Sequence, residues 1–120
     1  QLTSLGGMIF YDCTSLKTVK FAEGITRLPS RMFGNCVSLE TITLPASIEQ
    51  IDSKVFQGCT NLKTVYVKAT TPPEMSFLVF TDNKSQNLNC KIYVPDESVE
   101  EYKKASNWST YADQIEGYKF

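Results

Sequence analysis

The chain has 120 residues, of which 42% are apolar, and a formal net charge of −1. This length accommodates one domain, and the composition argues against a disordered chain and against a nucleic-acid binder, which would normally carry a basic stripe. The sequence contains no run of about 18 apolar residues, so we expect no membrane insertion. Because the chain begins inside a repeat, at Gln1, we interpret it as a fragment of a longer protein with an export signal upstream.

A period of 23 residues runs through the first half of the chain. Residues of one type recur in register, in columns such as Phe10, Phe33 and Phe56; Cys13, Cys36 and Cys59; and Leu16, Leu39 and Leu62. A unit of this size cannot bury its own apolar face, so it must stack on its neighbours. The spacing therefore predicts a solenoid, with regular repeats over residues 1–67.

Each repeat contains a segment rich in threonine and β-branched residues, which favours a strand. We predict strands at Leu16–Phe21, Leu39–Leu44 and Leu62–Val67, and shorter extended runs at Ile25–Leu28 and Ile48–Ile51 on the opposite wall. Stacked units run in the same direction, so the strands are expected to be parallel.

Two further segments connect these walls. Pro29–Phe33 and Asp52–Phe56 are predicted to form single helical turns, each with a Ser or Asp placed as a cap. Gly34–Asn35 and Gln57–Gly58 are predicted to reverse the chain and bring Cys36 and Cys59 inward.

The period loosens after Val67. Pro72 and Pro73 force an extended path, and the extra residues fall mostly in a polar loop over Thr81–Asn89. The strand pattern resumes at Ile92–Pro95. We therefore predict one stretched last repeat over residues 68–95.

Beyond Pro95 the period becomes helical. Asp96 is placed to begin a helix with Val99 and Tyr102 on one face, and a second short helix is expected over residues 107–115, ending before Gly117. Since a solenoid has an open apolar end, we predict that residues 96–120 form a helical C-terminal cap.

The aligned repeats resemble the BspA type of leucine-rich repeat protein, found on bacterial surfaces. The resemblance rests on the Phe-x-x-Cys-x-x-Leu-x-x-Ile/Val run beginning at Phe10, Phe33 and Phe56, and on the closing Ile92–Pro95 segment with Trp108 after it. It implies a right-handed β/α superhelix, rich in strands, with parallel strands on one side. It also implies an extracellular or cell-surface location, a role in adhesion or protein–protein contact, and no catalytic residues.

The residues offer little chemistry that would contradict this. Three cysteines spaced 23 apart lack the close pairs of a metal site, and the chain has no histidine, so we expect neither a metal nor another cofactor, and no Ser-His-Asp site. The carboxylates Glu49 and Asp52 have a structural explanation at a repeat turn. Strand spacing would permit a disulfide between neighbouring cysteines, but we favour buried unpaired thiols, with Cys90 half-exposed.

The outward strand positions form the candidate binding site. They make a two-column grid of Thr18, Lys20, Thr41, Thr43, Thr64, Tyr66, Lys91 and Tyr93. Tyr66 and Tyr93 are its aromatic residues, and tyrosine is enriched where interfaces bind most strongly. We predict these two as anchors, with Thr43, Thr64 and Lys91 as a polar rim. The alternative is that threonine and tyrosine merely suit an exposed strand.

Two functions are open at this point. The first is a bacterial cell-surface or secreted binding or adhesion module whose partner is an unidentified protein or other macromolecule. The alternative is a structural spacer with no ligand of its own. An aromatic patch on the sheet face favours binding, whereas a uniformly polar face favours the spacer.

Overall fold

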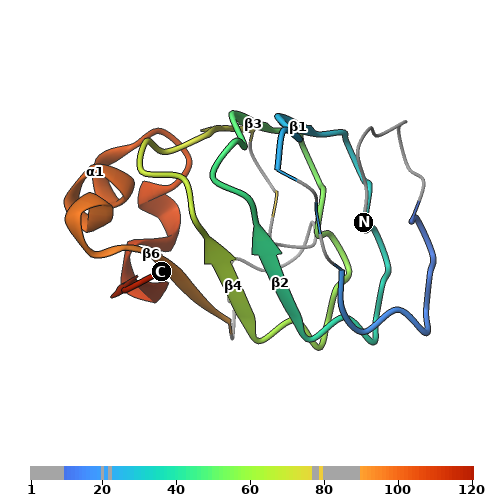
Figure 1. The fold of residues 1–120 in the computed structure, drawn as a ribbon. Helices are drawn as coiled ribbons and strands as arrows, with labels where there is room; N and C mark the ends of the chain where they lie inside the picture. Colours follow the sequence, from blue (N-terminus) through green and yellow to red (C-terminus); the bar gives the residue numbers. More distant parts are fainter. Residues whose placement is uncertain (1–9, 20, 22, 77–78, 80–89) are drawn as a thin grey trace.

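The computed structural model of the chain describes residues 10–19, 21, 23–76, 79 and 90–120. The predicted polar loop over Thr81–Asn89 and the grid position Lys20 lie outside the described residues. Two separate parallel sheets and a mostly helical C-terminal segment account for the described elements (Figure 1).

The larger sheet has four parallel strands in the order β2-β4-β6-β7. They are β2 (Thr41–Leu44), β4 (Thr64–Val67), β6 (Lys91–Pro95) and β7 (Ile115–Tyr118). The register pairs Ile42 with Val65, Val65 with Ile92 and Ile92 with Ile115, and all four side chains are buried. The alternation of threonine or tyrosine with β-branched residues places one set in the core and the other outside. Parallel pairing of the second, third and fourth predicted strands is confirmed.

The smaller sheet has the order β1-β3-β5. Its strands are short and parallel: β1 (Arg27–Leu28), β3 (Gln50–Ile51) and β5 (Glu74–Met75). The predicted runs at 25–28 and 48–51 are confirmed in their second halves, and β5 was not predicted. Leu28, Ile51 and Met75 align and are buried in the same apolar core as the inward residues of the larger sheet.

The prediction of helical turns at residues 29–33 and 52–56 is wrong. These segments are hydrogen-bonded turns, in which Arg31 and Lys54 have φ angles of 60° and 61°. A residue in this left-handed region cannot continue an α-helix. Asn35 and Gly58, with φ of 58° and 80°, then reverse the chain as predicted.

The predicted strand at residues 16–21 is also wrong for the part that the structure describes. Only Phe21 forms a β-bridge, and residues 16–19 belong to no strand. The backbone N–H of Glu40 donates to the carbonyl oxygen of Lys17 at 3.3 Å. This segment therefore lies beside β2 without the continuous ladder that joins β2 to β4.

The phenylalanine and cysteine columns form a ladder through the core. The Phe33 ring stacks between Phe10 and Phe56, with centroid distances of 5.4 and 5.6 Å. The thiols of Cys36 and Cys59 donate to the carbonyl oxygens of Phe10 and Phe33, the phenylalanines one repeat earlier. Equivalent cysteines thus point in the same direction along the stack.

Cys90 corrects another prediction, because it is buried rather than half-exposed. The reason is the two-residue period of a strand. Ile92 and Val94 point into the core from β6, and Cys90 lies two residues before Ile92 on the same side.

The C-terminal segment contains a short 3-10 helix η1 (Asp96–Ser98), α1 (Val99–Lys104), a second 3-10 helix η2 (Ser109–Gln114) and β7. The predicted helices are therefore present, but the prediction that Gly117 ends a helix is wrong, since Gly117 lies inside β7. A Cβ atom at Gly117 would lie 3.3 Å from Asp96 Cα. The absence of a side chain lets β7 approach η1 and complete the sheet.

Four side chains of this segment donate hydrogen bonds to backbone carbonyls in residues 69–75. The donors are Ser98, Tyr102, Asn107 and Trp108, and the acceptors are Thr70, Ala69, Met75 and Pro73, respectively. Tyr102 and Trp108 are fully buried, with their rings edge to face at 5.0 Å. Within the described residues, no helix is both long and apolar enough to cross a membrane.

Candidate binding site

The outward face of the larger sheet brings the predicted site residues together. Thr64 pairs in register with Lys91, and Thr43 and Tyr93 flank Tyr66 on either side. The Tyr66 and Tyr93 rings stack with their centroids 5.3 Å apart and their planes 19° from parallel. The five residues thus lie on three neighbouring strands, with the two tyrosines in direct contact.

Two residues that the sequence analysis missed extend this pair into an aromatic cluster, which we define as Tyr66, Tyr93, Tyr118 and Phe120. The Tyr118 ring lies 5.1 Å from Tyr66 and 5.6 Å from Tyr93, in edge-on arrangements, and the Phe120 ring lies 4.8 Å from Tyr118. Tyr118 is 43% exposed and Phe120 is 50% exposed. The cluster is therefore an apolar patch at the surface.

The signal for the two missed residues in the sequence is weak. Glu116, Tyr118 and Phe120 could share one face of a strand, but Ile115, Gly117 and Lys119 do not form a consistent apolar face opposite them. The helical spacing of Trp108, Tyr111 and Ile115 concealed it, because that spacing was extended to Gly117. Once β7 pairs with β6, Tyr118 falls beside Pro95 at the end of the sheet.

An ion pair borders the aromatic cluster. Lys91 Nζ lies 2.7 Å from Glu116 Oε2, and both side chains are about half exposed, at 56% and 47%. The hydrogen bond to Glu116 and its negative charge raise the pKa of the Lys91 ammonium. Because the pair is exposed, water screens it, so its main effect is to keep both charges beside the tyrosines.

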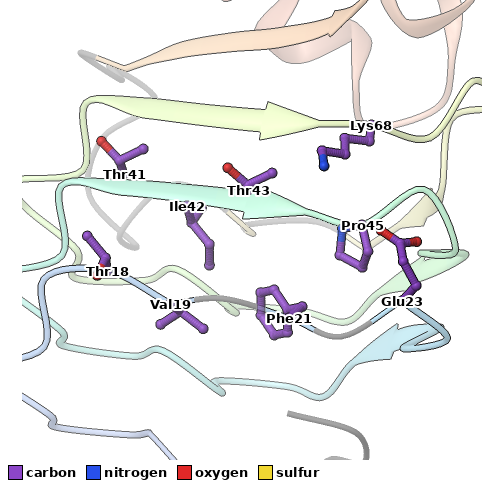
Figure 2. Close-up of a pocket in the computed structure, with 9 residues that line it drawn as sticks. All are labelled: Thr18, Val19, Phe21, Glu23, Thr41, Ile42, Thr43, Pro45 and Lys68. Atoms are coloured by element: carbon purple, nitrogen blue, oxygen red, sulfur yellow. The ribbon is translucent and has the colours of Figure 1, made fainter. Parts of the chain in front are cut away.

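A groove opens on the same face, between β2 and the segment that contains Thr18, Val19 and Phe21 (Figure 2). Its volume is about 380 Å³. The grid residues Thr18, Thr41 and Thr43 line it. The outward face therefore has a groove at one end and the aromatic cluster at the other.

The sequence matches one family model, the BspA type leucine rich repeat region, in six copies over residues 1–103. The chain belongs to the BspA-type leucine-rich repeat family. A search of the curated proteins found no match. The family accounts for the repeated Phe-x-x-Cys spacing on which the resemblance was based.

The cysteines of this BspA-type chain serve the core. None of the four forms a disulfide. Cys36 is buried as predicted, whereas Cys13 and Cys59 are only half-buried, so the prediction of buried thiols is wrong for these two. Burial raises the pKa of the Cys36 thiol, and it raises the pKa of Cys59 and of Cys90 to about 12. Such thiols stay protonated at neutral pH and are poor nucleophiles. Across the described residues, no group of three or more Cys, Asp or Glu side chains could hold a metal ion.

The carboxylate of Asp52 has a structural role as well. It is almost fully buried and accepts hydrogen bonds from Arg27 Nε at 2.7 Å and from Gln50 Nε2 at 2.8 Å. The contact with Arg27 joins neighbouring repeats, whereas Gln50 lies in the same repeat as Asp52. Both carboxylate oxygens are thereby engaged with the protein itself.

Proposed function

We propose that this BspA-type chain is a binding module of a bacterial cell-surface or secreted protein, and that it contacts a protein partner through the outward face of the larger sheet. Tyr66 and Tyr93 act as anchors, and Thr43, Thr64 and Lys91 form the polar rim. The exposed aromatic cluster is the observation that carries this proposal.

The exposure of the aromatic cluster supports this role. Soluble proteins rarely leave a contiguous apolar patch on the surface without a use for it. Three rings from three strands gather here with the ring of Phe120, which follows β7, whereas a spacer would need only polar residues at the same positions. Aromatic rings also supply a large contact area with few rotatable bonds, so little conformational entropy is lost on binding.

The architecture that we propose for this role is a right-handed solenoid in one domain. Residues 1–67 are the regular repeats, residues 68–95 the stretched last repeat, and residues 96–120 the cap. The hydrogen bonds from Tyr102 and Trp108 to the carbonyls of Ala69 and Pro73 support the role of the cap. Leucine-rich repeats are in general interaction modules, and we propose no catalytic activity for this chain.

Photo-crosslinking tests this proposal. A benzophenone amino acid replaces Tyr118, and the protein is irradiated with a panel of purified extracellular-matrix and bacterial surface proteins. The control carries the same group in place of Tyr11, which is 41% exposed but lies outside the aromatic cluster. We expect adducts from position 118 and not from position 11. Equal labelling, or labelling from position 11 alone, would reject the sheet face as the contact surface.

A further inference from the structure

The groove between β2 and the segment that contains Thr18, Val19 and Phe21 has an apolar base. Val19, Phe21 and Ile42 line it, with Ile42 buried in the core and the other two half-buried. These side chains point inward from their own segments. They line an open space here because Phe21 forms only a bridge, while β2 and β4 are joined by four register pairs.

Two charged residues stand at one end of the groove. Lys68 directly follows β4, and Glu23 lies two residues after Phe21. Within the part of the chain that the structure describes, neither side chain forms an ion pair, whereas Lys91 pairs with Glu116. Figure 2 shows the Lys68 ammonium directed toward Thr43 and the Glu23 carboxylate turned toward Pro45. Both charges border the groove, and the ammonium is the one that extends from this end toward Thr43.

We propose that the groove binds an apolar side chain of the protein partner together with a neighbouring carboxylate, which Lys68 binds. The apolar group fills the space above Val19 and Ile42. The hydroxyls of Thr18 and Thr41 border it and can hydrogen-bond to the peptide groups that flank this side chain. This site rests on the proposed function, because it assigns the chemistry of the segment that the sheet face would bind.

The position of the groove agrees with a single partner segment. Thr43 lines the groove and is the register partner of Tyr66, so the groove and the aromatic cluster are parts of one surface. Neighbouring strands lie about 4.8 Å apart, so β2 and β6 are separated by roughly 10 Å. An extended chain covers that distance with about three residues. One segment can therefore occupy the groove and reach Tyr93.

Three leucine derivatives that differ in charge test the proposal without the partner. N-acetyl-leucine carries a carboxylate, N-acetyl-leucinamide is neutral, and leucinamide carries an ammonium group. Each is titrated into the full chain, and the NMR methyl signals of Val19 and Ile42 are followed. We expect N-acetyl-leucine to shift these signals with a millimolar dissociation constant, and the other two compounds to bind more weakly.

Two variants assign the contact. Lys68→Gln should weaken the binding of N-acetyl-leucine about two- to fivefold, the range expected for an exposed ion pair. The control Lys104→Gln removes an exposed lysine of α1 and should change nothing. Absence of shifts with all three compounds would overturn the groove as a site. If leucinamide bound more tightly than N-acetyl-leucine, and Glu23→Gln weakened that binding, the groove would prefer a cation. The proposed carboxylate of the ligand would then be wrong. Neither outcome depends on the aromatic cluster, so crosslinking from position 118 would still decide the proposed function.

Discussion

The indole N–H of Trp108 donates to the carbonyl oxygen of Pro73 at 2.8 Å, a contact between residues 35 positions apart. Trp108 is fully buried, and Tyr102 packs edge-on against it. Together they cover the backbone around β5, which is the last strand of the smaller sheet among the described residues. The C-terminal segment is therefore expected to hold the last repeat closed.

Deleting residues 95–120 should expose that end of the core. It removes the last residue of β6, the helices η1, α1 and η2, and β7, and with them the buried rings of Tyr102 and Trp108. We expect aggregation or the loss of cooperative melting, measured by circular dichroism and light scattering. A soluble, monomeric truncation with an unchanged Tm would refute the role of this segment as a cap.

The repeat leucines should contribute more to stability than the cysteines. Leu39→Ala removes a fully buried side chain, which costs about 2–5 kcal/mol of a total near 5–15 kcal/mol. Cys36→Ala removes only a sulfur, and the Phe10 carbonyl still accepts the backbone N–H of Cys13 at 3.1 Å. Urea denaturation should show the larger loss of unfolding free energy for Leu39→Ala. Equal losses would mean that the thiol ladder contributes as much as the apolar columns.

The thiols of Cys59 and Cys90 should make stability depend on alkaline pH. The folded-state pKa of Cys59 and of Cys90 is about 12, above the ordinary thiol value of 9.0. The unfolded chain therefore releases protons that the folded chain retains, so the free energy of unfolding should fall as pH rises from about 9 toward 12. The measurement is urea denaturation at several pH values. A double variant, Cys59→Ala with Cys90→Ala, should show a smaller fall, and an identical fall would contradict the assignment to these thiols.

All four cysteines are expected to be unpaired in the isolated protein. Thiol counting in denaturant, without a reducing agent, should find four reactive groups per chain, in agreement with the absence of a disulfide in the structure. Two or fewer would show that neighbouring repeats are cross-linked.

Gly117→Ala should disturb β7 and the aromatic cluster together. The new Cβ would lie 2.3 Å from Asp96 Oδ1 and 3.3 Å from Asp96 Cα, so the Asp96 side chain must turn away and the backbones of η1 and β7 must separate slightly. Overpacking of this kind costs about 1–3 kcal/mol. Thermal melting should register the loss, and adding Asp96→Ala should restore part of it by removing the nearer atom. If Gly117→Ala alone is neutral, the close approach of η1 to β7 is incorrect.

The repeat made much of the fold predictable from the sequence. A strict 23-residue period places equivalent residues side by side, so the register of Ile42 with Val65 followed from counting. Tyr66 and Tyr93 are separated by the stretched repeat, and their contact followed from the strand pattern that resumes at Ile92. The apolar alternation of Thr41–Leu44 also determined which residues face the core.

The failures occurred where the period gives no information. Arg31 and Lys54 adopt left-handed φ angles that their residue types do not suggest. The segments that contain them were therefore predicted as helical turns, although they form non-helical turns. Strand β7 was missed because Ile115 fits a helical spacing as well as a strand, and only pairing with β6 decides between them. Because β7 was not predicted, Tyr118 and Phe120 were not placed on the sheet. Only two of the four residues of the aromatic cluster were therefore identified from the sequence.

The central claim is that the aromatic cluster anchors a protein partner. Its most direct test is the affinity of the partner captured by crosslinking, measured for the native chain, for Tyr66→Ala with Tyr93→Ala, and for Tyr11→Ala as the control. The account predicts at least about tenfold weaker binding in the double variant, equivalent to about 1.4 kcal/mol, with nearly unchanged Tm and no effect of Tyr11→Ala. Unaltered affinity in the double variant would contradict it.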